Sequence, residues 1–157
     1  MKTQARVTFV ESFAVPPETL FDVMLDHEGM SDWMGAKISV VRGPDDGGVG
    51  TVRRIEAGPG PAIDEEVTYV LRPRRIVYRI VAGAPPIRFH RGEILVEPWG
   101  ETGSQLTWDI LLDSAIPGVA RLVGAILEPQ IQKGLSKLRA QLGAVDHSSS
   151  STAPSAA

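Results

Sequence analysis

The chain has 157 residues, a length that suits one domain with one hydrophobic core. Its net charge of −3 argues against a protein that binds nucleic acid by neutralising phosphates. It contains no cysteine, which excludes disulfides, thiolate nucleophiles and cysteine-ligated metals, and with only three histidines we do not expect a multi-histidine metal site. We therefore expect no metal and no other cofactor.

The first predicted element is a strand over residues 6–15, because apolar and polar side chains alternate there. Phe9 should face the interior, and Glu11 shares its face. A carboxylate in that place needs a partner or acquires a raised pKa. Glu11 is therefore a candidate acid–base residue.

Two short helices are predicted after this strand. Pro16 and Pro17 end the strand and favour the start of a helix, which has an apolar stripe from Leu20 to Leu25 and is broken by Gly29. A short helical turn that carries Trp33 follows.

Six short strands are predicted in the middle of the chain, where runs of glycine and proline mark the turns. They lie at residues 37–42, 50–57, 63–72, 74–82, 88–97 and 104–113. Because most of the connections are short, neighbouring strands should pair antiparallel.

The last predicted element is a long amphipathic helix over residues 117–142, since its apolar residues recur every three or four positions. Pro129 should kink this helix, and Gly143 should cap its C-terminus. Residues 144–157 are low in complexity and poor in bulky apolar side chains, which predicts a disordered tail that includes His147. The folded domain is thus predicted to span residues 1–143.

These elements predict an α+β fold, a seven-stranded curved antiparallel sheet wrapped around the long C-terminal helix. A strongly curved sheet cannot lie flush along so long a helix, so a cavity should remain between them. Strand alternation turns Val67 and Tyr69 inward and places Tyr69 opposite Tyr78. Glu65 shares that face, but it lies at a strand end, where we expect it to be solvated.

The two strands nearest the C-terminus are predicted to form a hairpin around Gly100. In this register Ile94 lies opposite Trp108, and both face the interior. His90 shares the inward face of its strand, whereas Glu93 points the other way. The two residues therefore should not form a dyad.

Three stretches of the sequence resemble a known superfamily. They are VPPETLFDVMLDHEGMSDWM, FHRGEILVEPWGETGSQLTWDI and IPGVARLVGAILEPQIQKGLSKL. The first resembles the start of SRPBCC proteins, and the other two resemble the last hairpin and closing helix of the polyketide cyclase/dehydrase-like branch. The resemblance covers residues 4–142. It implies the helix-grip fold of START-related lipid carriers and birch-pollen-allergen-like proteins, with an apolar cavity between sheet and helix, and it carries over no invariant catalytic residues.

The predicted site is therefore chosen by position. Ligand-binding candidates are the residues expected to face the cavity, namely Phe9, Trp33, Val67, Tyr69, Tyr78, His90, Ile94, Trp108, Ile126 and Ile131. Catalytic candidates are His90, Tyr69, Tyr78 and Glu11, which could move a proton or polarise a carbonyl. Each also has a plainer interpretation: the histidine and tyrosines can be core residues bonded to the backbone, and the tryptophans can be packing.

The first functional hypothesis is the binding of a small hydrophobic ligand, a lipid or a polyketide-like molecule, in this cavity. The alternative is a polyketide cyclase or dehydratase that uses acid–base residues of the cavity. A role in protein interactions is a third hypothesis, but no surface patch supports it and no protein partner is indicated. Residues 1–15 lack the apolar run of a signal peptide, and no segment is apolar enough to insert stably in a membrane, so we expect a cytoplasmic protein.

Overall fold

The computed structural model describes residues 2–84 and 86–143. Its elements are β1 (Gln4–Phe13), α1 (Pro17–Leu25), α2 (Ser31–Met34), β2 (Lys37–Arg42), β3 (Val52–Glu56), β4 (Ile63–Leu71), β5 (Arg75–Ala82), β6 (Ile87–Trp99), β7 (Gly103–Ser114) and α3 (Val119–Leu142). This order confirms the predicted one. The predicted tail, residues 144–157 with His147, lies outside the described residues.

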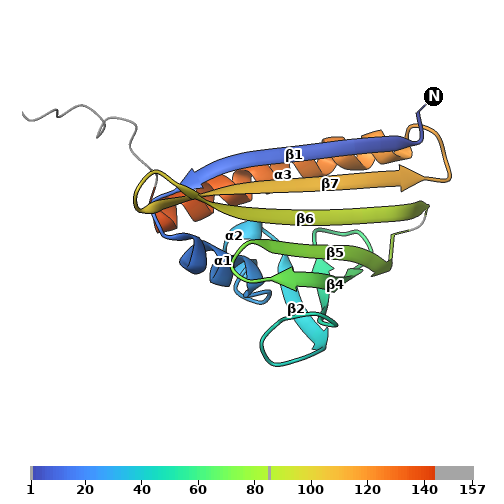
Figure 1. Cartoon of the computed structure of the whole chain (residues 1–157). Coiled ribbons are helices and arrows are strands. Elements are labelled where there is room, and N and C mark those ends of the chain that lie inside the picture. Colours follow the sequence, from blue (N-terminus) through green and yellow to red (C-terminus); the bar gives the residue numbers. More distant parts are fainter. Residues whose placement is uncertain (1, 85, 144–157) are drawn as a thin grey trace, which may run out of the picture.

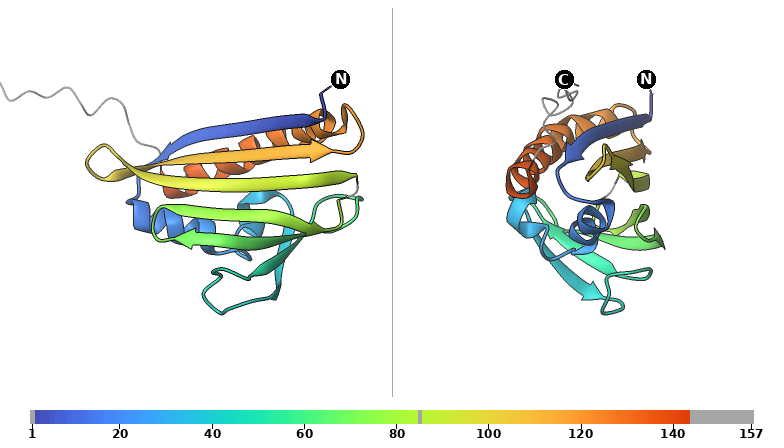
Figure 2. Two further views of the ribbon diagram at one scale, coloured as in Figure 1. Left: turned by 45° about the vertical axis from the view of Figure 1, so that its right-hand side comes forward. Right: turned by 60° about the vertical axis from the view of Figure 1, so that its left-hand side comes forward.

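The strands form one antiparallel sheet of seven strands in the order β1-β7-β6-β5-β4-β3-β2 (Figure 1). Strands β2 to β7 follow one another as the predicted meander, and β1 joins the sheet beside β7 at the far end of the chain. The sheet curves around α3, which lies along its concave side (Figure 2). The fold is therefore the predicted helix grip.

The register between β6 and β7 is the predicted one, with Ile94 opposite Trp108 and Gly92 opposite Ile110. Ile94 and Trp108 are buried, as their inward face requires. Glu93, between two inward residues, points to the convex face, where it pairs with Arg75. Alternation along the strand thus separates His90 from Glu93 as expected.

The register between β4 and β5 differs from the predicted one. Val67 pairs with Tyr78, and a bulge between Val67 and Tyr69 shifts the next pair to Tyr69 and Val77. The extra residue moves Tyr69 to the convex face, where 44% of it is exposed and its ring lies beneath the Arg75 guanidinium. The prediction that Tyr69 faces inward beside Tyr78 was wrong.

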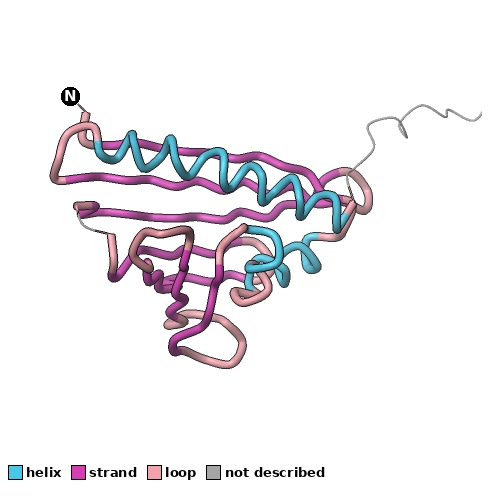
Figure 3. The backbone as a smooth tube through the Cα atoms, turned by 180° about the vertical axis from the view of Figure 1, so that it is seen from behind, coloured by secondary structure: helices cyan, strands magenta, loops and turns pink. Residues whose placement is uncertain are grey.

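Helix α3 runs without interruption past Pro129, and the predicted kink stays a prediction. The Gly143 N–H donates to the Arg139 carbonyl at 2.8 Å, which confirms the predicted cap. The helix lies close to β1 and α2 (Figure 3), since a Cβ on Gly124 would contact Val7 and one on Gly134 would contact Met34. In the part of the chain that the structure describes, no helix combines the length and apolar character needed to cross a membrane.

Candidate functional site

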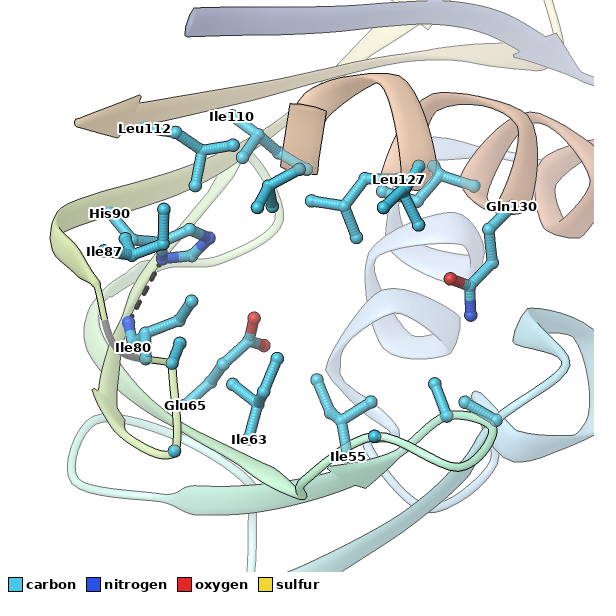
Figure 4. Close-up of a pocket in the computed structure, with 18 of the residues that line it drawn as sticks. Ile55, Ile63, Glu65, Ile80, Ile87, His90, Ile110, Leu112, Leu127 and Gln130 are labelled. Atoms are coloured by element: carbon cyan, nitrogen blue, oxygen red, sulfur yellow. Dashed lines mark hydrogen bonds between the residues drawn. The ribbon is translucent and has the colours of Figure 1, made fainter. Parts of the chain in front are cut away.

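A cavity of about 390 Å³ lies between the concave face of the sheet, α2 and the first half of α3. Figure 4 shows side chains converging on it from the strands and from the helix. Most of its lining is aliphatic and includes Ile38, Ile55, Ile63, Ile80, Ile110, Leu112, Val123 and Leu127. Its apolar walls and few polar groups are the features of a small-molecule site.

The cavity reaches the surface beside α3. Ile126 lines the cavity although 60% of it is exposed, so it lies at the mouth. Gly60 and Pro61 of the β3–β4 connection and Ala84 of the β5–β6 connection line it as well. Two connections and one helix therefore border the opening.

A buried ion pair forms one polar part of the lining. Arg53 of β3 donates from Nε and Nη2 to Oε2 of Glu65 on β4, at 2.9 and 2.8 Å. The two residues are direct partners in the β3–β4 register, and both are buried. Burial of either charge without the other would cost several kcal/mol, of the order of 3–5 kcal/mol.

His27 is hydrogen-bonded to the arginine of this ion pair. Its Nε2 lies 2.8 Å from the Gly47 carbonyl, which can only accept, so Nε2 carries the proton. Nδ1 is then free to accept from Arg53 Nη1, at 3.1 Å. Burial, and then the Arg53 charge, lower the pKa of His27, so its ring is neutral at neutral pH.

Tyr78 and Trp108 lie beside the ion pair. The Arg53 guanidinium stands 4.6 Å from the centre of the Tyr78 ring, a cation–π contact. The Trp108 indole N–H donates to the Tyr78 hydroxyl oxygen at 2.8 Å. Burial raises the pKa of Tyr78, so its hydroxyl stays protonated at neutral pH.

His90 presents its other ring nitrogen to the cavity. Its Nδ1 accepts from the Ile80 backbone N–H at 3.1 Å, and Figure 4 shows the ring turned inward from β6. Burial is the main cause that lowers the pKa of His90, which favours the neutral ring. In that form Nε2 carries the proton and offers the cavity one hydrogen-bond donor.

The structure brings together half of the predicted ligand-binding residues. Five line the cavity, namely Tyr78, His90, Trp108, Ile126 and Ile131. Four others, Phe9, Trp33, Val67 and Ile94, are buried in the core without lining it. For the three strand residues Phe9, Val67 and Ile94, alternation identified the correct face. These three and Trp33 of α2 pack in the core, so the prediction that they line the cavity was wrong.

Glu11 is directed toward α3 and away from the cavity. Its carboxylate accepts from Gln132 at 3.0 Å and from Arg139 at 3.4 Å. It belongs to β1, one of the two edge strands of the sheet. Its side chain is on the inward face there and contacts the side of α3. Neither Glu11 nor Tyr69 lines the cavity, and the prediction that they are cavity groups was wrong.

Three polar residues of the site were missed or misplaced by the sequence analysis. Glu65 was expected to be solvated and is buried, whereas Arg53 and His27 were not singled out. Alternation had already placed Glu65 on the face of the buried Val67, and a charge on an apolar face requires a partner. Searching the neighbouring strand for a cation would have found Arg53.

No metal-ligand arrangement is evident in the described residues. Groups of three or more histidine or carboxylate side chains placed to hold an ion are absent from residues 2–84 and 86–143. The cavity itself offers an apolar volume, the Glu65 carboxylate and the neutral His90.

Comparison with solved structures shows the same fold in several proteins. A START superfamily protein from Mycobacterium smegmatis is 19% identical, with 88% of this chain and 99% of that chain covered and a TM-score of 0.71. Major latex-like protein 151 from Panax ginseng is 12% identical, with coverage of 90% and 99% and a TM-score of 0.75. A norcoclaurine synthase point mutant from Thalictrum flavum is 16% identical, with coverage of 90% and 97% and a TM-score of 0.68.

At these identities the likeness establishes the fold and not the activity. No curated protein matches the chain. The sequence does match one family over residues 4–143, the family described as polyketide cyclase/dehydrase and lipid transport. That match spans nearly the whole described domain, and the chain therefore belongs to the polyketide cyclase/dehydrase and lipid transport family of the SRPBCC superfamily.

Proposed function

We propose that the protein binds a small, largely hydrophobic molecule in the cavity between the sheet and α3. The observation that carries this proposal is an apolar cavity of about 390 Å³ that opens at Ile126. Its volume falls in the range of small-molecule sites, roughly 300–1,000 Å³. The description of the family, which includes lipid transport, also supports it.

The indole N–H of Trp108 provides a direct probe of occupancy. Trp108 lines the cavity, whereas Trp99 at the β6–β7 hairpin is 39% exposed and remote from the lining. Titration with fatty alcohols, isoprenoids and flat polyphenols should give saturable shifts of the Trp108 indole signal in an ¹H–¹⁵N spectrum. The Trp99 signal should stay in place and serves as an internal control.

A matched pair of variants tests whether the cavity is the binding site. Leu127→Trp should fill it from α3 and abolish the shifts, because Leu127 lines it. Leu122→Trp changes an exposed residue of the same helix that does not line the cavity and should leave binding intact. Thermal unfolding of both variants checks that α3 still packs. Binding that survives Leu127→Trp with unchanged affinity would contradict the proposal, as would the absence of any Trp108 shift.

The second candidate function is a cyclase or dehydratase activity on a poly-β-ketone. The observation that favours it is a carboxylate and an imidazole in the same apolar cavity, on Glu65 and His90. Such a pair can remove a proton from carbon and polarise a carbonyl. Turnover of a poly-β-keto substrate that His90→Ala abolishes would establish the enzyme; binding of the same substrate without turnover would leave the carrier function.

A further inference from the structure

The charges of the cavity lining cancel each other. Of the described lining residues, Arg53 alone carries a positive charge and Glu65 alone a negative one. The other polar side chains are neutral at neutral pH, namely Tyr78, His90, Trp108 and Gln130. The cavity therefore contains no net charge that could balance a charged ligand.

The guanidinium of Arg53 has little capacity left for a ligand. Nε and Nη2 donate to Glu65, and Nη1 lies within hydrogen-bond distance of His27 Nδ1 and of the Met30 sulfur, at 3.1 and 3.2 Å. The face of the group is covered by the Tyr78 ring. Four of its five N–H donors thus have protein partners.

The carboxylate of Glu65, in contrast, has one oxygen without a hydrogen-bond partner among the described residues. Both bonds from Arg53 reach Oε2, and Oε1 accepts no hydrogen bond from any residue that the structure describes. Figure 4 shows this carboxylate directed into the cavity. A carboxylate oxygen accepts strongly from a hydroxyl, and such a bond to a charged group contributes about 1.5–3 kcal/mol.

His90 completes the polar end of the cavity with a donor. Its Nδ1 is occupied by the Ile80 N–H, and Nε2 has no partner among the described residues. Ile80, whose N–H binds His90, is also the register partner of Glu65 on β4, and both side chains line the cavity, so the two groups lie in one neighbourhood. One hydroxyl group satisfies both, because it has a hydrogen to donate and lone pairs that accept.

We infer that the ligand is an uncharged molecule with an alcohol or phenol group, whose hydroxyl donates to Glu65 Oε1 and accepts from His90 Nε2–H. This inference rests on the proposed function and names the class of ligand. A carboxylate or phosphate headgroup would lie beside Glu65 as a buried like charge, with Arg53 already paired, and is disfavoured. A molecule that lacks the hydroxyl leaves Glu65 Oε1 unpaired in an apolar site.

The test compares three para-pentyl aromatic ligands at neutral pH. They are 4-pentylphenol, 4-pentylanisole, in which a methyl group replaces the donor hydrogen, and 4-pentylbenzoate, which is an anion. Dissociation constants come from isothermal titration calorimetry, and the Trp108 indole shift reports that each ligand occupies the cavity. The phenol should bind about tenfold or more tightly than either of the others, the ratio expected for one hydrogen bond to a charged group.

Two variants of the full chain test whether Glu65 is the residue that selects the phenol over the other two ligands. Glu65→Gln leaves the Arg53 charge unbalanced, so the benzoate should gain at least tenfold in affinity and the phenol should lose its advantage. Glu66→Gln is the matched control, because the adjacent Glu66 lies on the convex face near Arg79 and does not line the cavity. This control should keep the wild-type order of the three ligands. If Glu65→Gln does not fold, the ranking on the wild-type protein decides by itself.

The outcomes separate this inference from the proposed function. Equal affinity for all three ligands, each with a Trp108 shift, would overturn the inference and leave the binding function standing. A benzoate that binds more tightly than the phenol would overturn it as well. If none of the three shifts Trp108, both the inference and the proposed function fail.

Discussion

The ring of Tyr78 lies directly on Gly92, its partner on the neighbouring strand β6. The two residues are opposite each other in the β5–β6 register, and a Cβ at Gly92 would overlap the ring carbon Cζ. Only a glycine leaves the surface of β6 flat enough for this contact. The glycine thereby holds the Tyr78 hydroxyl where the Trp108 indole can donate to it.

Gly92→Ala should force the Tyr78 ring off β6. Overpacking of this kind costs about 1–3 kcal/mol of unfolding free energy, measurable by urea denaturation. The Trp108 indole signal should shift at the same time, because its acceptor moves. Gly60→Ala is the control, since a Cβ there meets no atom within 4 Å. Equal stability of the two variants would contradict the proposed role of Gly92.

Tyr78→Phe and Tyr69→Phe should behave differently, although both remove one hydroxyl. Tyr78→Phe leaves the buried Trp108 N–H without its acceptor, at a cost of about 1–3 kcal/mol. Tyr69 lies on the convex face, so Tyr69→Phe should change the unfolding free energy by less than about 0.5 kcal/mol. Urea denaturation of both variants checks the difference, and equal losses would contradict the two placements.

Removal of one partner of the buried ion pair should destabilise the protein strongly. Arg53→Met leaves the Glu65 carboxylate unpaired and should lower the unfolding free energy by about 3–5 kcal/mol. Arg54→Met is the matched control, because the adjacent Arg54 pairs with Asp64 at the surface, where water screens the pair, and the loss of unfolding free energy should be much smaller. The double variant Arg53→Met/Glu65→Leu should recover most of the loss. A double variant as unstable as Arg53→Met would show that charge is not the cause.

Stability should fall as the pH falls below about 6.5, because burial lowers the pKa of both His27 and His90 in the folded state. The unfolded chain, with histidines near their ordinary pKa of 6.5, then binds more protons than the folded one. The stability that neutral histidines contribute is fully present above that pH and is lost as the pH approaches the lowered values.

Urea denaturation at a series of pH values checks this, with His27→Gln/His90→Gln as the comparison. The double variant should show a flatter profile below pH 6.5, the ordinary pKa of histidine. The carboxylates with lowered pKa, such as Asp109 and Asp113, act in a separate window below their ordinary value of 3.8. A profile in the double variant as steep as in the wild type would contradict the assignment to the histidines.

Much of the architecture followed from local patterns. The alternation in β6 and β7 predicted that Ile94 lies opposite Trp108, and the helical period predicted α3 up to Gly143. These features depend on side-chain spacing within one element or one hairpin, which the sequence displays directly. The same alternation correctly turned Tyr78 and His90 toward the interior.

The predictions were wrong where the orientation or burial of a side chain depends on a local backbone irregularity or on a residue far away in the sequence. The bulge in β4 inserts one residue at Thr68, and the pattern around Tyr69 gives no sign of it. Glu65 was misjudged because its burial depends on Arg53, twelve positions away on another strand. Glu11 faces inward as its parity requires, yet it meets α3, since β1 pairs with β7 at the edge of the sheet.

Spacing and composition by themselves determined the kind of elements in this protein, their order and, except beyond the bulge in β4, the faces their strands bury, since each of these depends on neighbours along the chain. Only the tertiary structure decided that β1 closes against β7, that Arg53 and Glu65 neutralise each other, and that His27 supports them. Those contacts join residues far apart in sequence. Whether they form depends on how the curved sheet and α3 divide the interior between packed core and open cavity. That division cannot be read from the sequence of any single segment.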